Sequence, residues 1–238
     1  MSSFTHPDHI RYTAEITNVR EVTLHGTADL AFWRRLLQPY RLLPASSDGA
    51  AQIVLSATAL VWKGLAFREL IVTIATCTDR DQPQHDSFYL AHAFNSLRLL
   101  AWTERRFFQT PYTHADVYIN TSQPEMELWH HNRLLFKAQM IGNQAPAVQH
   151  DEAWNGPVFL PAHASGEPTG RHFFVALSGE QAIYPFVAGT DLIEIAPNGD
   201  QPVFQWLRES QFTPTEWRIR TSANHARSKT YRRDSSKL

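Results

Sequence analysis

The sequence predicts an α+β protein built on one mostly antiparallel sheet, closed or strongly curved, with a few flanking helices. Three observations support this fold class. Segments of strand-like composition come as adjacent pairs along the chain. Helix-like segments are few. Strands and helices do not alternate regularly, which argues against a doubly wound parallel fold.

The composition is that of a folded protein of nearly neutral charge. The 238 residues are 43% hydrophobic and 12% aromatic, which is enough for a sizeable core. The net charge of -1 gives no general attraction to nucleic acid or to an anionic membrane. We therefore expect neither as a partner, and we interpret the basic C-terminal RSKTYRR segment as solvated sequence.

Cys77 is the single cysteine, so no internal disulfide is expected and a cytoplasmic location fits. Because Cys77 ends an apolar run, we expect a buried and inert thiol. The N-terminus has no basic segment followed by an apolar run, so no signal peptide is expected. No apolar stretch approaches the roughly 18 residues of a transmembrane helix.

The first third of the chain is expected to form strands around one helix. Residues 12–24 alternate weakly, which suits one or two strands. Thr27 can cap a helix in the segment that follows it, which Pro39 and Pro44 end. Residues 52–62 and 67–77 are typical of two strands of a hairpin that turns at Lys63-Gly64.

Residues 87–120 are the most informative stretch and predict a strand, a helix, a proline turn and a strand. Residues 87–94 alternate as a strand does. Asn95 or Ser96 can cap a helix over residues 95–108. Pro111 stops the helix, because it disfavours the helical region for the residue before it. Residues 112–120 return to strand-like composition.

The rest of the chain is expected to hold further strands and one helix. We expect a single domain over residues 1–221 and a polar, disordered tail over residues 222–238. The expected elements are a hairpin of 125–130 and 134–141 with Asn132 in the turn, a long loop over 142–170 with one short strand at 158–160, strands at 172–177, 181–187 and 192–195, a helix at 202–212 and a short strand at 217–221.

Polar residues gather around the proline turn: Glu104, Arg105, Arg106, Tyr112 and His114. Arginines at the C-terminus of a helix are favoured by the helix dipole, which requires no function. Alternatively, these groups point into a pocket, where an arginine can hold a carboxylate by paired hydrogen bonds. The residues alone leave both interpretations open.

Glu69 lies inside an apolar strand and shares a face with Phe67 and Ile71. If that face lines the interior, Glu69 is a buried carboxylate that needs a partner. Its pKa is then open to tuning for general acid or base catalysis. If the face is on the solvent side, Glu69 is an ordinary exposed residue, and the sequence does not choose between the two.

Neither a metal nor a cofactor is expected. The twelve histidines are scattered, apart from His130 and His131. Neighbouring residues on a regular strand point to opposite faces, so these two are not expected to bind one metal. No GxGxxG, GxxxxGK[ST], GxSxG, HExxH or CxxC motif occurs.

The order of these features resembles the acetoacetate decarboxylase-like superfamily. A strand containing (Tyr/Phe)-x-Glu precedes a loop, a strand and a helix that ends in Arg before a proline turn. Arg105 and Pro111 match the helix end of the decarboxylases. Glu69 matches the active-site glutamate of the family. The resemblance covers roughly residues 24–120.

A closer resemblance is to uncharacterised bacterial members of that superfamily, whose helix runs on through Leu-Pro-Tyr-x-x-Ala. This chain has Thr-Pro-Tyr-Thr-His-Ala over residues 110–115. The resemblance implies a cone-shaped, mostly antiparallel β-barrel with flanking helices, a central pocket and an oligomer.

The chain departs from the decarboxylases at their catalytic lysines. Tyr112 and Thr113 stand where the resemblance places the Schiff-base lysine and its lysine neighbour. Neither side chain has the amine that a Schiff base requires. Lys137 is the one candidate replacement among the four lysines. Decarboxylation by the family's mechanism is therefore not expected.

Two functions remain open. In the first, the pocket binds a small oxo- or carboxylic acid through Arg105, His114 and His92 without chemistry, or is largely filled by its own aromatic side chains. In the second, the protein is a lyase or hydratase-type enzyme acting on a small keto acid. Glu69 would then be the general acid or base, and Arg105 would hold a carboxylate or enolate. Tyr112 and His114 would donate hydrogen bonds to a developing oxyanion. The missing lysine favours the first slightly.

Overall fold

A computed structural model describes residues 10–77, 86–161, 170–197 and 200–232. Parts of the predicted loops at 78–86 and 142–170, and the last six residues of the predicted tail (233–238), lie outside the described residues. The strands are β1 (Tyr12–Ala28), β2 (Leu43–Pro44), β3 (Ser46–Ser47), β4 (Ala50–Trp62), β5 (Leu65–Cys77), β6 (Ser87–Asn95), β7 (Tyr112–His114), β8 (Asp116–Asn120), β9 (Glu125–His130), β10 (Arg133–Gln139), β11 (Val148–Phe159), β12 (Arg171–Pro185), β13 (Leu192–Ile195), β14 (Thr213–Ser228) and β15 (Tyr231–Arg232). The helices are α1 (Leu30–Leu37), α2 (Arg98–Thr103) and α3 (Pro202–Glu209), with a 3-10 turn at Gln38–Tyr40 and a π-helix at Glu104–Phe108.

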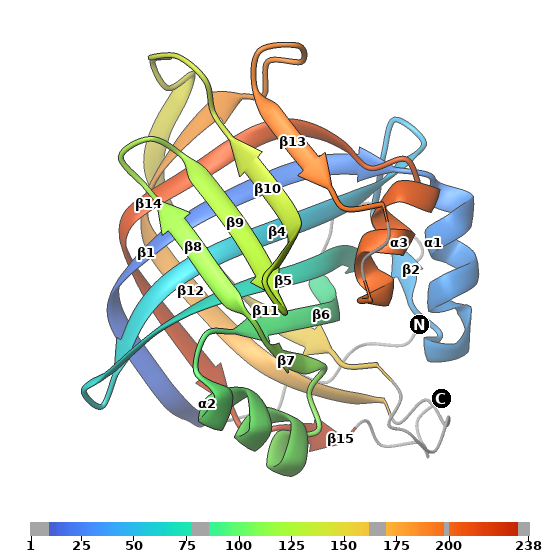
Figure 1. Cartoon of the computed structure of the whole chain (residues 1–238). Helices are drawn as coiled ribbons and strands as arrows, with labels where there is room; N and C mark the ends of the chain where they lie inside the picture. Colours follow the sequence, from blue (N-terminus) through green and yellow to red (C-terminus); the bar gives the residue numbers. More distant parts are fainter. Residues whose placement is uncertain (1–9, 78–85, 162–169, 198–199, 233–238) are drawn as a thin grey trace.

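The larger sheet curls into a ring (Figure 1). Its strands follow one another in the order β5, β4, β1, β14, β12, β11 and β6. Because β6 pairs with both β11 and β5, the sheet closes on itself. The pairings of β6 with β11 and with β7 are parallel, and the others in the ring are antiparallel. The predicted fold class, a mostly antiparallel sheet with few helices, is confirmed.

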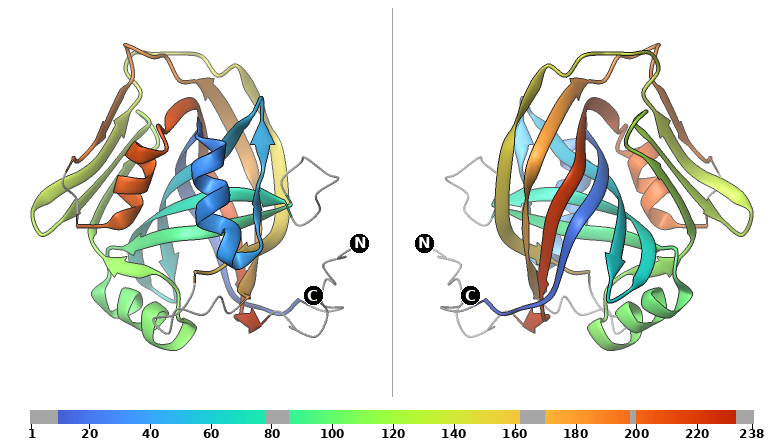
Figure 2. Two further views of the ribbon diagram at one scale, coloured as in Figure 1. Left: turned by 90° about the vertical axis from the view of Figure 1, so that its right-hand side faces the viewer. Right: turned by 90° about the vertical axis from the view of Figure 1, so that its left-hand side faces the viewer.

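A second sheet, in the order β13, β10, β9 and β8, lies outside the ring. Figure 2 shows α1 and α3 on the outside of the ring as well. Phe204 of α3 stacks between Phe94 of β6 and Phe136 of β10, with ring centroids 5.7 and 6.0 Å apart. Aromatic stacking and apolar burial therefore fix the second sheet to the ring.

The helix α1 begins later than predicted. Thr27 belongs to β1, and the side chain of Asp29 instead accepts a hydrogen bond from the Phe32 backbone N–H. The last residue of α1, Leu37, is buried in the main core together with Trp33. The longer pairing of β1 with β4 takes Thr27 out of the capping position.

Three predictions in the C-terminal half are wrong. The loop over 142–170 contains the twelve-residue strand β11, and the two strands predicted at 172–177 and 181–187 are one, β12. The tail does not begin at residue 222, because β14 continues to Ser228 between β1 and β12. Pairing on both sides supplies backbone hydrogen bonds that a polar side-chain pattern does not reveal.

Candidate functional site

A row of polar residues crosses the inside of the ring. Register pairs Arg220 with Glu21, Glu21 with Thr58, Thr58 with Glu69 and Glu69 with Asn95. Directly opposed residues of antiparallel strands point to the same face of the sheet. The alternate residues of these strands pack in the main core against the outer helices. The row therefore faces the interior, which is the orientation that makes Glu69 a candidate for acid–base chemistry.

Glu69 is half-buried and is surrounded mainly by neutral donors and another carboxylate. Its Oε1 accepts a hydrogen bond from Asn95 Nδ2 at 2.8 Å, and its carboxylate accepts another from the Tyr112 hydroxyl. Burial raises the pKa of Glu69 and the charge of Glu104 adds to this, while Asn95, Arg227 and Tyr112 oppose it. The resulting pKa of about 7 lies where a proton can be taken up or released at neutral pH.

Glu104 and Arg227 form an ion pair beside Tyr112. Arg227 Nη1 lies 2.6 Å from Glu104 Oε1, and Thr110 Oγ1 donates to Glu104 Oε2 at 2.8 Å. The guanidinium of Arg227 lies over the ring of Phe173, 4.2 Å from its centroid. The Nη2 of Arg227 is buried and makes no hydrogen bond to a described residue. Arg227 therefore still has a donor to offer an acceptor inside the ring.

The local chain conformation brings Glu104 to this place. The helix α2 continues as a π-helix over Glu104–Phe108, and Gln109 closes it with a positive φ of 53°. The wider turn directs Glu104 toward Arg227, while Arg105 and Arg106 remain exposed. Such π-helical turns are frequent at functional sites.

The predicted cap of this helix is wrong. The helix begins at Arg98 after Leu97, rather than after Asn95 or Ser96. The Asn95 side chain instead accepts a hydrogen bond from the Leu97 backbone N–H at 2.7 Å and donates to Glu69. Asn95 therefore starts a turn and holds the carboxylate.

A pocket of about 480 Å³ lies between the helix α2, the strand β7 and the turn that joins β9 to β10. Among the described residues that line it there is no carboxylate. Tyr112 lines the pocket and also contacts Glu69, so it joins the two regions. The lining residues are Arg98, Ala101, Trp102, Arg105, Tyr112, Thr113, His114, His130 and His131.

The structure divides the predicted site residues between these two regions. Arg105, Tyr112 and His114 line the pocket, whereas Glu69 lies behind Tyr112 inside the ring. His92 does not belong to the lining, but its Nε2 lies 3.0 Å from Thr113 Oγ1, which does. Burial, with a contribution from His130, lowers the pKa of His92 to about 4, so His92 is neutral at pH 7.

The sequence reasoning missed Arg98 and Arg227. Arg98 lies seven residues before Arg105, and this spacing places two helical residues on one face. The spacing could therefore have indicated that Arg98 lies on the same side of the helix as Arg105. Arg227 fell in the predicted tail. Its ion pair with Glu104 joins residues 123 positions apart, a contact that no local pattern reports.

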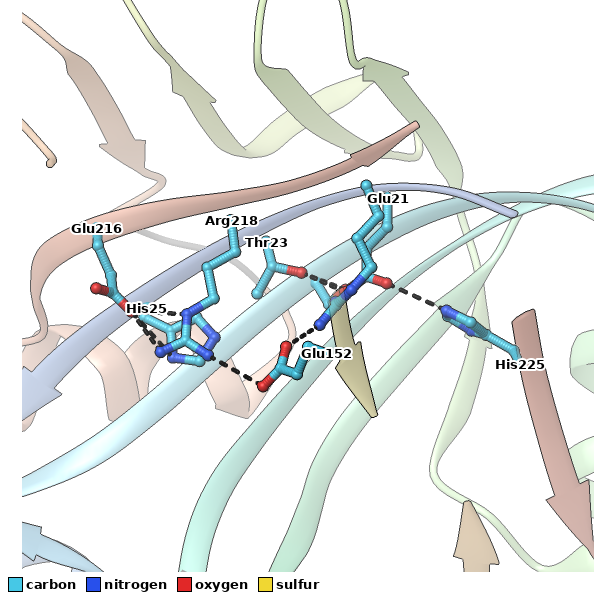
Figure 3. Close-up of polar contacts among 9 residues, drawn as sticks. Glu21, Thr23, His25, Glu152, Glu216, Arg218 and His225 are labelled. Carbon is cyan, nitrogen blue, oxygen red and sulfur yellow. Dashed lines mark hydrogen bonds and ion pairs between the residues drawn. The ribbon is translucent and has the colours of Figure 1, made fainter. Parts of the chain in front are cut away.

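A second polar cluster surrounds Glu21 inside the ring (Figure 3). Glu21 Oε1 lies 3.0 Å from Arg220 Nη1 and accepts from Thr23 Oγ1 at 2.7 Å, and Oε2 lies 3.1 Å from His225 Nε2. Burial alone would raise the pKa of Glu21. The pKa of Glu21 is nevertheless lowered to about 2. The effect of burial is outweighed by the hydrogen bond and charge of His225, the charge of Arg220 and the hydrogen bond from Thr23.

Lys137 does not occupy the position of a catalytic amine. It lies on β10 of the outer sheet, 2.9 Å from Glu125 and 2.7 Å from Glu127. The hydrogen bonds to the two glutamates raise the pKa of Lys137 above its ordinary value. A Schiff base needs the neutral amine, so this environment opposes the role considered for Lys137.

Comparison with known proteins identifies the fold. No family model and no curated protein matches the sequence. A structure of acetoacetate decarboxylase from Legionella pneumophila is similar with a TM-score of 0.62 and 10% identity, over 98% of this chain and 93% of that one. An acetoacetate decarboxylase-like enzyme from Sphingomonas wittichii RW1 gives 0.58 and 15%, over 99% of each chain.

A third similar structure carries a bound molecule. The enduracididine biosynthesis enzyme MppR, complexed with the condensation product of pyruvate and imidazole 4-carboxaldehyde, gives a TM-score of 0.59 and 12% identity, over 94% of this chain and 90% of that one. At these identities the likeness concerns the fold, and the chain has the acetoacetate decarboxylase-like fold.

Within the described ranges, no helix is both long enough and apolar enough to cross a membrane.

Proposed function

We propose that this protein binds a small oxo- or carboxylic acid in the pocket between α2, β7 and the β9–β10 turn. One observation carries the proposal: two arginines and three histidines line the pocket, with no carboxylate among its described lining residues. Such a lining favours an anion. The volume of 480 Å³ also lies in the range of about 300–1,000 Å³ that is usual for small-molecule sites.

The lining residues suggest how the acid is held. Arg98 and Arg105 can bind a carboxylate by paired hydrogen bonds, and His114 can donate to a neighbouring oxo group. Trp102 and Tyr112 supply apolar surface for the carbon chain. A pyruvate-derived molecule bound to the similar MppR supports this ligand class.

The proposal includes four further points. The protein belongs with the members of the superfamily that carry the Pro-Tyr-x-x-Ala signature and lack the Schiff-base lysine. It consists of one domain, acts in the cytoplasm in keeping with its single, buried cysteine, and forms the homo-oligomer that the resemblance implies. Light scattering coupled to size-exclusion chromatography tests the last point, and a monomer at all concentrations would refute it.

Calorimetric titration with a panel of acids tests the binding function. The panel contains pyruvate, 2-oxobutyrate, acetoacetate and acetate, each against the wild type and Arg105→Gln. Loss of a charge-assisted hydrogen bond should weaken binding by about 10-fold or more. Arg106→Gln is the matched control, because Arg106 is an exposed neighbour that does not line the pocket. Equal losses in the two variants, or no binding of any acid, would reject the site.

A second function rests on Glu69. Its pKa of about 7 and its hydrogen bond with Tyr112, which lines the pocket, favour proton transfer to a bound keto acid. The protein would then be a lyase or hydratase-type enzyme that works without a Schiff base. With an identified substrate, Glu69→Gln should abolish turnover and the pH inflection near 7 while leaving binding at Arg105 in place. Undiminished turnover in Glu69→Gln would reject the acid–base role, and only the binding function would remain.

A further inference from the structure

The turn between β9 and β10 brings two neighbouring histidines together. His131 and Asn132 form its two-residue loop, and both have positive φ, 51° and 59°. This is the backbone pattern of a type I′ hairpin turn. It removes His131 from the strand alternation, so the prediction of opposite faces is wrong. The rings of His130 and His131 lie 4.0 Å apart between centroids.

Asp200 completes a group of three potential metal ligands. Its Oδ2 lies 3.0 Å from His130 Nδ1, although the two residues are 70 positions apart in the chain. One ligand atom from each of His130, His131 and Asp200 lies within 4.8 Å of the others. The ligands of a tetrahedral zinc ion lie roughly 3.3 Å apart at metal distances near 2.0–2.1 Å. Small side-chain rotations therefore suffice to close the set around one ion.

We propose that His130, His131 and Asp200 form a binding site for a divalent transition-metal ion, with zinc as the best fit. Two imidazoles and one carboxylate suit zinc, whereas magnesium and calcium prefer sets of oxygen ligands. Three protein ligands leave a fourth position open. His130 and His131 also line the pocket, so the ion would lie beside it.

The surroundings fit such a site. The side chain of His130 is 12% exposed and that of Asp200 is 53% exposed, so an ion can enter from solvent. His114 lines the same pocket and the smaller cavity of about 280 Å³ beside it, together with His130 and His131. An ion at this place would also strengthen the attraction of the pocket for an acid. Binding of the ion, however, does not depend on the proposed acid-binding function.

Calorimetric titration of the full chain with Zn²⁺ alone, with no organic acid present, tests the site. We expect one ion per chain in the wild type. His131→Asn removes the imidazole but keeps the turn, because asparagine favours positive φ at this position. Asp200→Ala removes an exposed carboxylate and should leave the fold intact. Since loss of an outer-shell partner already weakens metal binding by about 10–100-fold, each variant should lose at least that much affinity.

His150→Asn is the matched control, because His150 is exposed on β11 and lies outside the group. It should keep the wild-type affinity. Cobalt gives a second readout, since the visible absorption of tetrahedral Co²⁺ should appear in the wild type and be lost in both site variants. No zinc binding by the wild type would overturn the proposal. So would unchanged binding in His131→Asn and Asp200→Ala, or an equal loss in His150→Asn, which would indicate adventitious binding by surface histidines.

The result separates this site from the proposed acid pocket. Arg105→Gln should bind zinc with wild-type affinity, because Arg105 contributes no ligand to the group. Failure of zinc binding with acid binding intact would reject the metal site alone. Zinc binding without acid binding would reject the proposed function alone.

Discussion

Glu21 and Glu69 lie in the same cross-strand row inside the ring, separated only by Thr58, yet their pKa values move in opposite directions. Glu21 has Arg220 and His225 as hydrogen-bonded partners, and its pKa falls to about 2. Within the part of the chain that the structure describes, Asn95 and Tyr112 donate hydrogen bonds to Glu69. Its charged neighbours Glu104 and Arg227 act in opposite directions, and its pKa rises to about 7. Burial is the largest influence on both and raises the pKa in each case.

The difference shows that the partners, and not the depth, decide what a buried carboxylate can do. A glutamate paired with a guanidinium stays ionised and holds strands together. A glutamate held by neutral donors beside another carboxylate can exchange a proton near neutral pH. Within the row, Glu21 therefore stabilises the ring, while Glu69 is the candidate for chemistry.

The largest expected effect is the loss of the partner of Glu21. Arg220→Met leaves a buried carboxylate without its guanidinium and should reduce the free energy of unfolding by about 3–5 kcal/mol at pH 7. Urea denaturation measures the change. Arg218→Met is the control, because Arg218 is partly exposed and pairs with the partly exposed Glu216, and its loss should cost below about 1 kcal/mol. Equal losses of free energy in the two variants would show that the buried network stabilises the protein no more than the exposed ion pair does.

Acid should remove the stabilisation that Glu21 provides. Its folded pKa of about 2 lies below its ordinary value of 4.5, so the stabilisation is complete above pH 4.5 and is lost as pH falls toward 2. Because each tenfold change in the protonation equilibrium corresponds to about 1.4 kcal/mol, this amounts to about 3 kcal/mol. Denaturation of the wild type and Glu21→Gln at pH 5, 4 and 3 measures it, and a slope that survives in Glu21→Gln would assign the loss to other groups.

Glu69 should show the opposite pH dependence, with a smaller amplitude. The folded pKa of Glu69, about 7, lies above its ordinary value of 4.5. The contribution of the protonated side chain to the free energy of unfolding is therefore complete below pH 4.5 and is lost as pH rises through 7. Because the side chain is partly exposed, we expect about 2 kcal/mol. Between pH 5 and pH 8, Glu69→Gln should lose that much less stability than the wild type. Parallel pH curves would mean that Glu69 is ionised throughout.

The smallest effect should come from the neighbour of Glu69. Glu104→Gln removes a like charge and releases Arg227 from its ion pair, and both changes favour ionised Glu69. The pKa of Glu69 should fall toward its ordinary value while that of Glu21 stays in place, with a cost in stability of about 1 kcal/mol. Carbon-13 titration of the side-chain carboxyl groups follows both. An unchanged or raised pKa of Glu69 would contradict the assigned role of Glu104.

Local patterns predicted many of the elements. The hairpin of β4 and β5, the strand β6, the hairpin of β9 and β10 and the helix α3 all occur where composition and periodicity indicated. They could be predicted because each buries a regular apolar face. The strands β11, β12 and β14 could not be predicted in full, because they carry polar residues into the ring and depend on pairing with distant strands.

The site was predictable only in part. Arg105, Tyr112 and His114 were identified from the stretch around the proline turn, and the structure places all three at one pocket. Glu69 was identified separately, as a carboxylate inside an apolar strand. Arg227 was not identified, because it reaches Glu104 from the other end of the chain.

By itself, the sequence determined the largely antiparallel architecture and the polar group around the proline turn, because both depend on residues close together in the chain. Only the tertiary structure decided which carboxylate is paired, which strands close the ring, and that His130, His131 and Asp200 meet. The physical reason is that the charge of a buried group and the reach of a ligand depend on groups that the fold brings near from distant positions. Alternation and spacing report only the residue's own strand or helix.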